Sequence, residues 1–500
     1  MHNTTEIIKL KREKLQKIIE MGINPYHNRV ERTHQIKELQ QKRENLLQSQ
    51  EEITIAGRLT ALRRHGKIGF ANIEDMSGKI QLYVRLDTIG EADYEIYKHC
   101  DLGDFIQTRG VAIITERGEY SLKCLTLKLL SKNLRPIPTV KEKVIDGKTV
   151  RYDEFSDIEL RYRKRYLDLL LNPDNKATFI TRANIIRFMR EYLDNHDFIE
   201  VETPVLQPLY GGAYARPFIT HHNTLDIDLY LRIATELYLK RLIIGGFEKV
   251  YEIGKDFRNE GMDRNHNPEF TMLEVYQSYA DYHTMMDLTE DMITTIAKKL
   301  FNSTSFQYDN HTISLQKPWA RGSMIDLIKK ETGLDTSDCD LAKLTSFFKE
   351  HNLEIPEKAT AGELIIELFE IYIEKNLIQP TFIIDFPKEV SPLAKSRVDN
   401  PHFVERFELF IAGHELGNAF TELNDPIEQE RRLQKQAAMR EAGDMEAAPF
   451  DEDFLEAMEY GMPPTGGLGI GVDRLCMLFT NNSSIKEVIL FPQMKPEHHI

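Results

Sequence analysis

The sequence predicts an α+β fold in which a small β-barrel precedes a larger domain with a mainly antiparallel sheet flanked by helices. Short alternating runs of β-branched and aromatic residues fill residues 51–135, and strands alternate with helices in no regular βαβ order after residue 173. The chain has 500 residues, whereas single hydrophobic cores stop growing at roughly 250 to 300 residues. We therefore expect two or three domains.

Residues 1–50 are expected to form a charged helical extension. Its pattern is broken at GINPY, residues 22–26, so we expect two helices. The segment holds ten Lys and Arg residues against six Glu residues, although the whole chain has a formal net charge of −15. The overall charge excludes a protein that coats nucleic acid along its whole surface. The basic segment is either one local polyanion contact or a solvated helix face.

Residues 51–135 match the size of the five-stranded OB-fold barrel, with short strands separated by turns such as HGK and MSGK. Barrels of this kind often bind single-stranded nucleic acid, with aromatic side chains stacked on bases and basic side chains along the phosphates. Phe70 and Tyr83, with Arg63 and Lys67 nearby, suit such a use. Core aromatics and solvated basic residues are the alternative.

The rest of the chain divides into a connector and a large domain. Residues 136–172 are expected to be a proline-containing linker followed by a hinge helix, and residues 173–500 the large domain. A long amphipathic helix leads into the short strand FIEVETPVL, residues 198–206. Residues 283–378 are largely helical in pattern, and we expect them to pack outside the sheet as an insertion.

Several classes of protein are disfavoured by the sequence. No apolar run approaches the roughly 18 residues that span a bilayer, and the N-terminal residues lack the apolar region of a signal peptide. We therefore expect a cytoplasmic protein. The cysteines are widely scattered without C-x-x-C spacing, which predicts free, mostly buried thiols at Cys100, Cys124, Cys339 and Cys476.

Two expected strands, EFTMLEVY and GNAFTEL, each place an aromatic residue and a carboxylate on one face. Burying an uncompensated carboxylate is expensive, so a cationic or amine-bearing ligand would satisfy these faces, with a solvated sheet face as the alternative. The residues that share the two faces are Phe270, Met272, Glu274 and Tyr276 in the first strand and Asn418, Phe420 and Glu422 in the second.

A phosphate-binding arrangement is also predicted. Glycines alternate in GGLGIGVDRL, residues 466–475, which leaves one strand face bare so that a flat ligand can lie against the backbone. Arg258 and Arg474 lie beside turn or glycine elements, and arginine suits bidentate phosphate contacts.

Glu408 and Glu415 are candidate magnesium ligands, since this hard ion takes carboxylates plus phosphate oxygens. On one regular strand they would point to opposite faces, so sharing an ion requires a turn or bulge near Ala412 and Gly413. The residues alone therefore predict a magnesium–nucleotide site beside an amine-binding pocket.

Three segments resemble the motifs of class II aminoacyl-tRNA synthetases. FRNEG and HNPEFTMLEVY, within residues 257–276, resemble motif 2, GGLGIGVDRL resembles motif 3, and the helix leading into FIEVETPVL resembles motif 1. The match extends over nearly the whole chain and is most similar to the bacterial-type lysyl-tRNA synthetases of subclass IIb. The resemblance implies a homodimer that activates L-lysine with ATP and Mg2+ to lysyl-adenylate plus pyrophosphate. Lysine then passes to the 3′-terminal adenosine of tRNA(Lys).

The resemblance also implies roles for individual residues. Arg258, Arg474 and His266 would be catalytic, contacting the phosphates. ATP would be bound by Arg258, Glu260, His266, Asn267, Phe270, Glu408 and Arg474, with Glu408 and Glu415 holding the metal. Lysine would be bound by Gly212, Glu236, Arg258, Glu274, Tyr276, Asn418, Phe420, Glu422 and Gly469. The anticodon would be read by Arg63, Phe70, Gln81 and Glu119 of the barrel.

The chain departs from the family pattern at three positions. Asn265 and His414 stand where the family commonly has arginine, and Thr235 stands where it commonly has proline. Two other functions fit the same motifs less well. An aspartyl- or asparaginyl-type synthetase is disfavoured by the carboxylates Glu236 and Glu422, because an aspartate pocket needs cations. A catalytically silent RNA-binding paralogue is disfavoured because the residues of the nucleotide site are intact.

Overall fold

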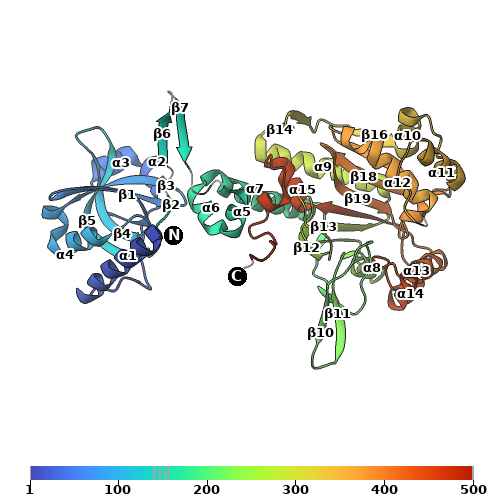
Figure 1. The fold of residues 1–500 in the computed structure, drawn as a ribbon, viewed down its shortest axis with the longest axis horizontal. Coiled ribbons are helices and arrows are strands. Elements are labelled where there is room, and N and C mark those ends of the chain that lie inside the picture. The colour runs from blue at the N-terminus through green and yellow to red at the C-terminus, as the bar shows by residue number, and fades with distance from the viewer. Residues whose placement is uncertain are drawn as a thin grey trace. The chain divides into compact units, whose positions relative to one another are not determined.

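The computed structural model describes residues 2–138, 141–145, 148–152, 155, 157–357 and 359–497. The chain divides into two compact units, Met1–Ser156 and Asp157–Ile500 (Figure 1). Each unit has its own hydrophobic core.

The first unit is built around a closed barrel with strand order β1-β2-β3-β5-β4. This confirms the barrel that the alternating residues predict. Along β2 the burial alternates, so that Ala71 and Ile73 enter the core while Phe70 and Asn72 lie on the outer face. The strands are β1 (Ile53–His65), β2 (Ile68–Asp75), β3 (Gly78–Arg85), β4 (Phe105–Ile114) and β5 (Tyr120–Ser131).

Helices α1 (His2–Glu20), α2 (Ile36–Gln41) and α3 (Arg43–Ser49) precede the barrel, and α4 (Leu86–His99) connects β3 to β4. The expected break at residues 22–26 is confirmed. The second expected helix is two short helices instead, because Lys42, at φ −96° and ψ 17°, leaves the helical conformation between them.

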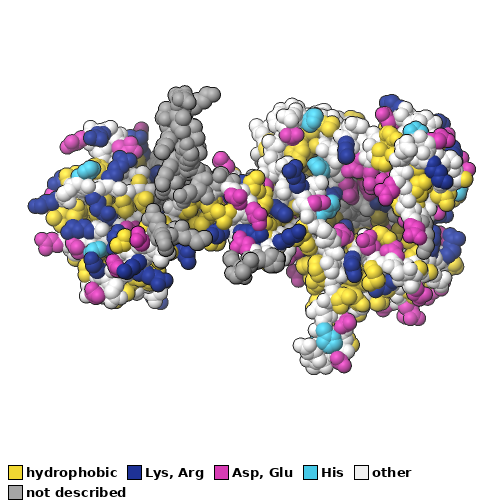
Figure 2. All heavy atoms as spheres, viewed as in Figure 1, with side chains coloured by type: hydrophobic (Ala, Val, Ile, Leu, Met, Phe, Trp, Pro, Cys, Tyr) yellow, Lys and Arg dark blue, Asp and Glu magenta, His cyan; other side chains and the backbone are white. Residues whose placement is uncertain are grey.

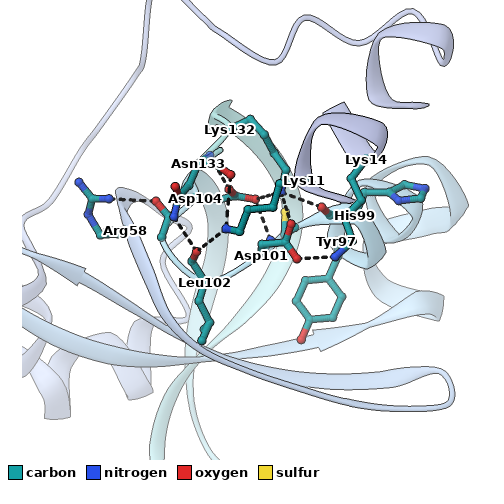
Figure 3. A network of polar contacts seen from close by, with 12 residues as sticks. Lys11, Lys14, Arg58, Tyr97, His99, Asp101, Leu102, Asp104, Lys132 and Asn133 are labelled. Carbon is teal, nitrogen blue, oxygen red and sulfur yellow. Dashed lines mark hydrogen bonds and ion pairs between the residues drawn. The ribbon is translucent and has the colours of Figure 1, made fainter. Parts of the chain in front are cut away.

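A buried charge cluster holds α1 against the barrel (Figure 3). Lys132 Nζ lies 2.7 Å from Asp101 Oδ2 and 2.7 Å from Asp104 Oδ2, and the Lys132 and Asp104 side chains are fully buried. From α1, Lys14 pairs with Asp101, and Lys11 Nζ donates to the carbonyl of Leu102 at 3.4 Å. The cluster therefore joins the helical extension to the end of β5.

Part of the expected linker forms an antiparallel hairpin. Strands β6 (Lys141–Ile145) and β7 (Lys148–Tyr152) pair with each other, and the expected hinge segment contains α5 (Ile158–Arg163) and α6 (Arg165–Leu171).

The second unit is organised around an eight-stranded sheet with order β16-β17-β18-β19-β20-β13-β12-β8. Only the two outermost pairs are parallel, which confirms the mainly antiparallel sheet. Its strands are β8 (Ile199–Glu200), β12 (Lys249–Phe257), β13 (Glu269–Ser278), β16 (Ala320–Ser323), β17 (Thr381–Pro387), β18 (Phe403–Ile411), β19 (His414–Thr421) and β20 (Thr465–Gly471). A smaller sheet contains β9 (Leu206–Gln207), β10 (Ile219–His222) and β11 (Ile227–Leu231).

Helices cover both faces of the large sheet. The apolar face, which includes Leu273 and Val275, packs against α7 (Pro173–Asp194), α9 (Tyr282–Phe301) and α15 (Val472–Phe479). The opposite face is polar at its centre and packs against α8 (Glu236–Ile244) at one side. The C-terminal part of the unit also contains α13 (Pro426–Glu441), α14 (Glu452–Glu459) and α16 (Ile485–Val488).

Residues 283–378 are less purely helical than the sequence predicts. They contain α10 (Met324–Thr332), α11 (Leu341–Glu350) and α12 (Ala361–Tyr372), but also β16 and the hairpin of β14 (Ser305–Tyr308) and β15 (His311–Ser314). The hairpin turns at Asp309, whose φ of +49° is a conformation that aspartate tolerates better than most residues. The segment therefore extends the sheet as well as covering it.

The cysteines are free thiols, with Cys100, Cys124 and Cys476 buried and Cys339 half-buried, as expected. Among the described residues, we find no helix that has both the length and the apolar character needed to cross a membrane.

Candidate functional site

The polar face of the large sheet forms one wall of a cavity of about 1370 Å³. Figure 2 shows Asp and Glu side chains gathered around a hollow in this unit. All of the nucleotide, amino-acid and metal candidates from the sequence line this one cavity: Gly212, Glu236, Arg258, Glu260, His266, Asn267, Phe270, Glu274, Tyr276, Glu408, Glu415, Asn418, Phe420, Glu422, Gly469 and Arg474.

Strand β13 places Glu274 and Tyr276 on the cavity side and Leu273 and Val275 in the core, as its alternation predicts. Tyr276 Oη donates a hydrogen bond to Glu274 Oε2 at 3.1 Å, and the backbone N–H of Thr235 donates to Glu274 Oε1 at 3.2 Å. Burial, with neighbouring carboxylates, raises the pKa of Glu274 to about 8. A ligand that brings a positive charge would therefore stabilise this carboxylate in its ionised form.

Glu236, at the start of α8, and Glu422, just after β19, lie beside one buried ammonium group. Lys240 Nζ is 2.5 Å from Glu236 Oε1 and 2.5 Å from Glu422 Oε2. Burial raises the pKa of Glu422 to about 8, with Lys240 opposing this shift and Glu236 adding to it. Two carboxylates thus face the cavity with a single cation behind them.

The glycines of β20 make room for these side chains. Gly467 lies opposite Tyr276 and Phe420 in the sheet. A Cβ atom at Gly467 would lie 1.9 Å from Glu422 Oε1 and 2.6 Å from the Tyr276 ring. The bare strand face therefore accommodates the acidic pocket's own side chains as well as any flat ligand.

Gly212 is required by its own geometry. Its φ is +85°, and a Cβ atom there would lie 3.1 Å from the side chains of Ala234 and Glu236. A larger residue would be strained and would push against the acidic pocket.

Arg258 follows β12 and lines the cavity. Its Nε is buried and has no hydrogen-bond partner among the residues that the structure describes. Its guanidinium lies 5.1 Å from the ring centroid of Phe270. A carboxylate or phosphate oxygen would satisfy the unpaired donor.

Two further nucleotide candidates, Glu260 and Asn267, differ in whether their side chains already have partners within the protein. Glu260 is exposed at the cavity edge. Asn267 is buried, and its amide is occupied by the chain itself, donating to the carbonyl of Glu269 at 2.6 Å and accepting from the backbone N–H of Gln493 at 3.2 Å.

His266 and Arg474 meet at the cavity. Arg474 Nη2 is 3.4 Å from His266 Nε2, and Asp263 accepts from His266 Nδ1 at 2.9 Å. In this arrangement Nδ1 of His266 donates to Asp263 and Nε2 is the atom that faces Arg474. Arg474 also donates to Glu415 Oε2 at 3.1 Å. Two cationic or donating groups therefore converge near a carboxylate that is a candidate metal ligand.

Glu408 and Glu415 share a face of the sheet because the chain turns between them. Ala412 and Gly413 form the turn, with φ of +55° and +73°. A shift in register next to Phe410 marks a bulge in the hairpin. The expected turn or bulge is confirmed. Burial and the charge of Glu415 raise the pKa of Glu408 to about 7.

The sequence did not single out Lys240, Arg406 or Asp263. Arg406 Nη2 donates to Glu408 Oε1 at 2.5 Å and its Nε donates to Asn418 Oδ1 at 3.0 Å, so it ties two candidates together. The spacing of Lys240 four residues after Glu236 on a helix was the available signal. Within the described part of the chain, no group of three or more His, Cys, Asp or Glu side chains is arranged to hold a metal ion.

The three departures from the family pattern all lie at the site. Asn265 and His414 line the cavity, and burial together with Arg474 lowers the pKa of His414. Thr235 supplies the backbone N–H that Glu274 accepts, a donor that proline lacks.

The anticodon candidates lie on the outer face of the barrel in two neighbouring groups. Gln81 and Glu119 line a second hollow of about 590 Å³. Phe70 is half-buried outside the barrel core and stacks on Tyr83 with ring centroids 5.2 Å apart, and Arg63 is its cross-strand neighbour. Phe70 therefore has a partly open aromatic face, and the core alternative does not hold.

Comparison with known proteins gives the same two parts. Residues 157–495 match the tRNA synthetases class II (D, K and N), and residues 53–130 match the OB-fold nucleic acid binding domain. The chain is 51% identical to a lysine–tRNA ligase of Bacillus subtilis (strain 168), covering 99% of both chains. It is 51% identical to one of Oceanobacillus iheyensis over 98% of both chains, and 49% identical to one of Clostridium tetani over 100% of this chain and 98% of that protein. The chain belongs to the class II tRNA synthetases (D, K and N), within the lysine–tRNA ligase family.

Proposed function

We propose that this chain is an ATP-dependent ligase that converts L-lysine and ATP to lysyl-adenylate and pyrophosphate, then transfers lysine to the 3′-terminal adenosine of tRNA(Lys). One observation carries the proposal. A single cavity holds three buried carboxylates, Glu236, Glu274 and Glu422, together with Arg258, whose buried Nε has no partner among the described residues. Such a cavity suits a molecule with two ammonium groups and one carboxylate.

The carboxylates divide between the two ammonium groups of lysine. Glu274, near Gly212 and Thr235, would meet the α-amino group, while Glu236, Glu422 and Tyr276 would meet the side-chain ammonium. A pocket built around a desolvated ammonium leaves its carboxylates unpaired when the wrong amino acid enters, and that penalty supplies selectivity. Asn418 and Gly469, opposite each other in the sheet, would lie along the substrate, and Phe420 would line its aliphatic stem.

Arg258 would hold the lysine carboxylate and the α-phosphate together. Attack of the carboxylate on the α-phosphate depends chiefly on placing the two groups and on stabilising negative charge, since pyrophosphate leaves with its own charges. Arg474 and His266, which touch each other at the cavity, would hold the outer phosphates. Glu260, Asn267 and Phe270 would surround the adenosine.

We propose Mg2+ as the divalent ion of this reaction, held by Glu408 and Glu415. The two carboxylates share a face, and the pKa of Glu408 is raised to about 7 by burial and by Glu415, so a cation between them would be favourable. Two protein carboxylates with phosphate oxygens completing the shell is the arrangement that Mg2+ prefers. When bound, the ion would neutralise phosphate charge and orient pyrophosphate as the leaving group.

The barrel would bind the anticodon. Phe70, with its partly open ring, would stack on a base, and Arg63, Gln81 and Glu119 would contact base edges. A homodimer through the motif 1 region is supported by exposed apolar side chains on and after α7, at Ile180, Ile199 and Leu206. Cytoplasmic placement stays a prediction.

ATP–pyrophosphate exchange with each proteinogenic amino acid in turn tests the proposal. We expect exchange with lysine, and exchange with another amino acid but none with lysine would refute it. Arg258→Lys is expected to abolish exchange in a folded protein, because a point charge does not replace the bidentate fork. Arg63→Lys, on the barrel, is the matched control and should leave lysine-dependent exchange unchanged.

A further inference from the structure

We propose that Lys240 is a positioning residue that sets the charge of the side-chain pocket so that it accepts one cation. This inference rests on the proposed function, since it concerns the same pocket. Lys240 lies on α8 one turn after Glu236, is 0% exposed, and touches one oxygen of Glu236 and one of Glu422.

The carboxylates of Glu236 and Glu422 each have one oxygen on the side of Lys240 and one on the opposite side. Lys240 occupies Glu236 Oε1 and Glu422 Oε2 from behind, and it does not line the cavity. Glu422 Oε1 faces the space that the missing side chain of Gly467 leaves open. Within the residues that the structure describes, Lys240 donates a hydrogen bond to Glu236 Oε1, whereas its contact with Glu422 Oε2 is an ion pair without a hydrogen bond. Glu236 Oε2 and Glu422 Oε1 have no hydrogen bond either, so each carboxylate keeps an acceptor for a ligand.

The charges then fix what the pocket takes. Glu236 and Glu422 carry two negative charges when ionised, and Lys240 cancels one of them. One ammonium group would bring the pocket to neutrality, a neutral side chain would leave it negative, and a buried uncompensated charge is unfavourable. Although burial opposes its charge, Glu236 and Glu422 together raise the pKa of Lys240, which keeps the internal cation protonated.

This assignment predicts that removing Lys240 restores lysine binding in a variant that has lost one of the two carboxylates. In Glu236→Gln, Lys240 alone satisfies Glu422, the pocket is neutral without ligand, and the KM for lysine in exchange should rise about 100-fold or more. Adding Lys240→Met restores one net negative charge. The double variant should therefore have a KM for lysine at least about tenfold below that of Glu236→Gln.

If Lys240 had only a structural role, adding Lys240→Met to Glu236→Gln would raise the KM for lysine further, because the pocket would lose a second buried partner. A double variant with a KM equal to or above that of Glu236→Gln overturns the assignment. A double variant that fails to fold also overturns the assignment, because its buried groups have the same net charge as those of the parent. If Glu236→Gln itself is unfolded, Glu422→Gln with and without Lys240→Met makes the same comparison.

The single variant Lys240→Met and a matched control complete the test. Lys240→Met should raise the KM for lysine, because one ammonium group then leaves the pocket with an uncompensated negative charge, while the KM for ATP stays within about twofold. Lys132→Met removes an equally buried lysine from the barrel and should leave the KM for lysine unchanged. If the parent chain exchanges no pyrophosphate with lysine, the proposed function fails. If the parent exchanges but the double variant shows no repair, only this inference fails.

Discussion

Two buried lysines, Lys132 in the barrel unit and Lys240 in the sheet unit, each lie between two carboxylates, yet their surroundings differ. Around Lys132, Asp104 accepts from the backbone N–H groups of Asp101 and Asn133, each at 2.7 Å. The other oxygen of Asp101 pairs with Lys14. Every carboxylate oxygen of the barrel cluster therefore has a partner.

Around Lys240 the cluster is incomplete. Glu236 and Glu422 each give one oxygen to Lys240 and turn the other toward a cavity. The same arrangement of one cation and two anions is thus fully paired in the barrel and leaves carboxylate oxygens unpaired beside the cavity of the sheet unit. The difference lies in the neighbours: backbone N–H groups in one case and a strand of glycines in the other.

The largest effect that follows is rejection of norleucine, which has the shape of lysine without the ammonium group. An open cluster should discriminate against it by about 10⁴-fold in kcat/KM, because its carboxylates stay unpaired. ATP–pyrophosphate exchange with lysine and norleucine measures the ratio. Discrimination below about tenfold would mean that packing alone selects the substrate, as one methylene does in an apolar pocket.

Lys132→Met should destabilise the barrel unit by about 3 to 5 kcal/mol, because it leaves a buried carboxylate without its cation. Hydrogen exchange of β4 and β5 amides measures the change in that unit by itself. Amides of β13 and β20 should exchange as in the parent. Unchanged protection in β4 and β5 would show that the closed cluster contributes little, and would remove the contrast with Lys240.

The strand faces of the site were predictable, because a period of two residues needs no tertiary information. Glu274 and Tyr276 lie toward the cavity and Leu273 lies in the core as the alternation of β13 predicts. The bulge between β18 and β19 was predicted only indirectly, because Glu408 and Glu415 need a turn or bulge between them to share one face of the sheet. An extra residue in a strand has no local signature, so its position came from the structure.

Lys240 shows what the sequence does not reveal. A glutamate followed four residues later by a lysine on a helix is the usual pattern of a solvated surface pair. Here the pair is buried, with Glu236 lining the cavity and Lys240 behind it. This burial depends on Glu422 and on the approach of the helix to the sheet, both set by distant parts of the chain. The two strands of the β14–β15 hairpin were missed for a different reason, since each spans only four residues.

The two clusters should also differ in their response to pH. The pKa of Glu422 is raised to about 8 by burial and by Glu236, against the opposing effect of Lys240. Glu274 and Tyr276 face the same pocket from β13. The pKa of Glu274 is also raised to about 8 by burial and neighbouring carboxylates, so below that pH both carboxyl groups hold protons that the two ammonium groups of the ligand must displace. The KM for lysine should therefore fall as pH rises toward about 8, by at most about 100-fold per unit.

The pH series needs a control from the closed cluster. Lys132→Met should show the parent's profile of KM for lysine against pH. In the barrel, burial would raise the pKa of Asp101, but hydrogen bonds from Lys132 and Lys14 lower it, whereas burial raises the pKa of Asp104. The contribution of Asp101 to stability is therefore present above the ordinary aspartate pKa and is lost only as pH falls through the lowered value. A KM for lysine that is flat between pH 6 and 8 would contradict the raised pKa of Glu422.

The smallest expected effect is that of Lys14→Met, at the exposed edge of the closed cluster. Its side chain is 38% exposed, so its pair with Asp101 is largely screened and should contribute about 0 to 1 kcal/mol. Hydrogen exchange in α1 measures this, since Lys14 is one of the residues that holds α1 to the barrel. Lys11→Met, which removes a buried side chain from the same helix, is the matched comparison and should loosen α1 more. If amide exchange in α1 increased as much in Lys14→Met as in Lys11→Met, the exposed ion pair would contribute as much to holding α1 as the buried lysine does. Burial would then not explain the difference between the barrel cluster and the cluster around Lys240.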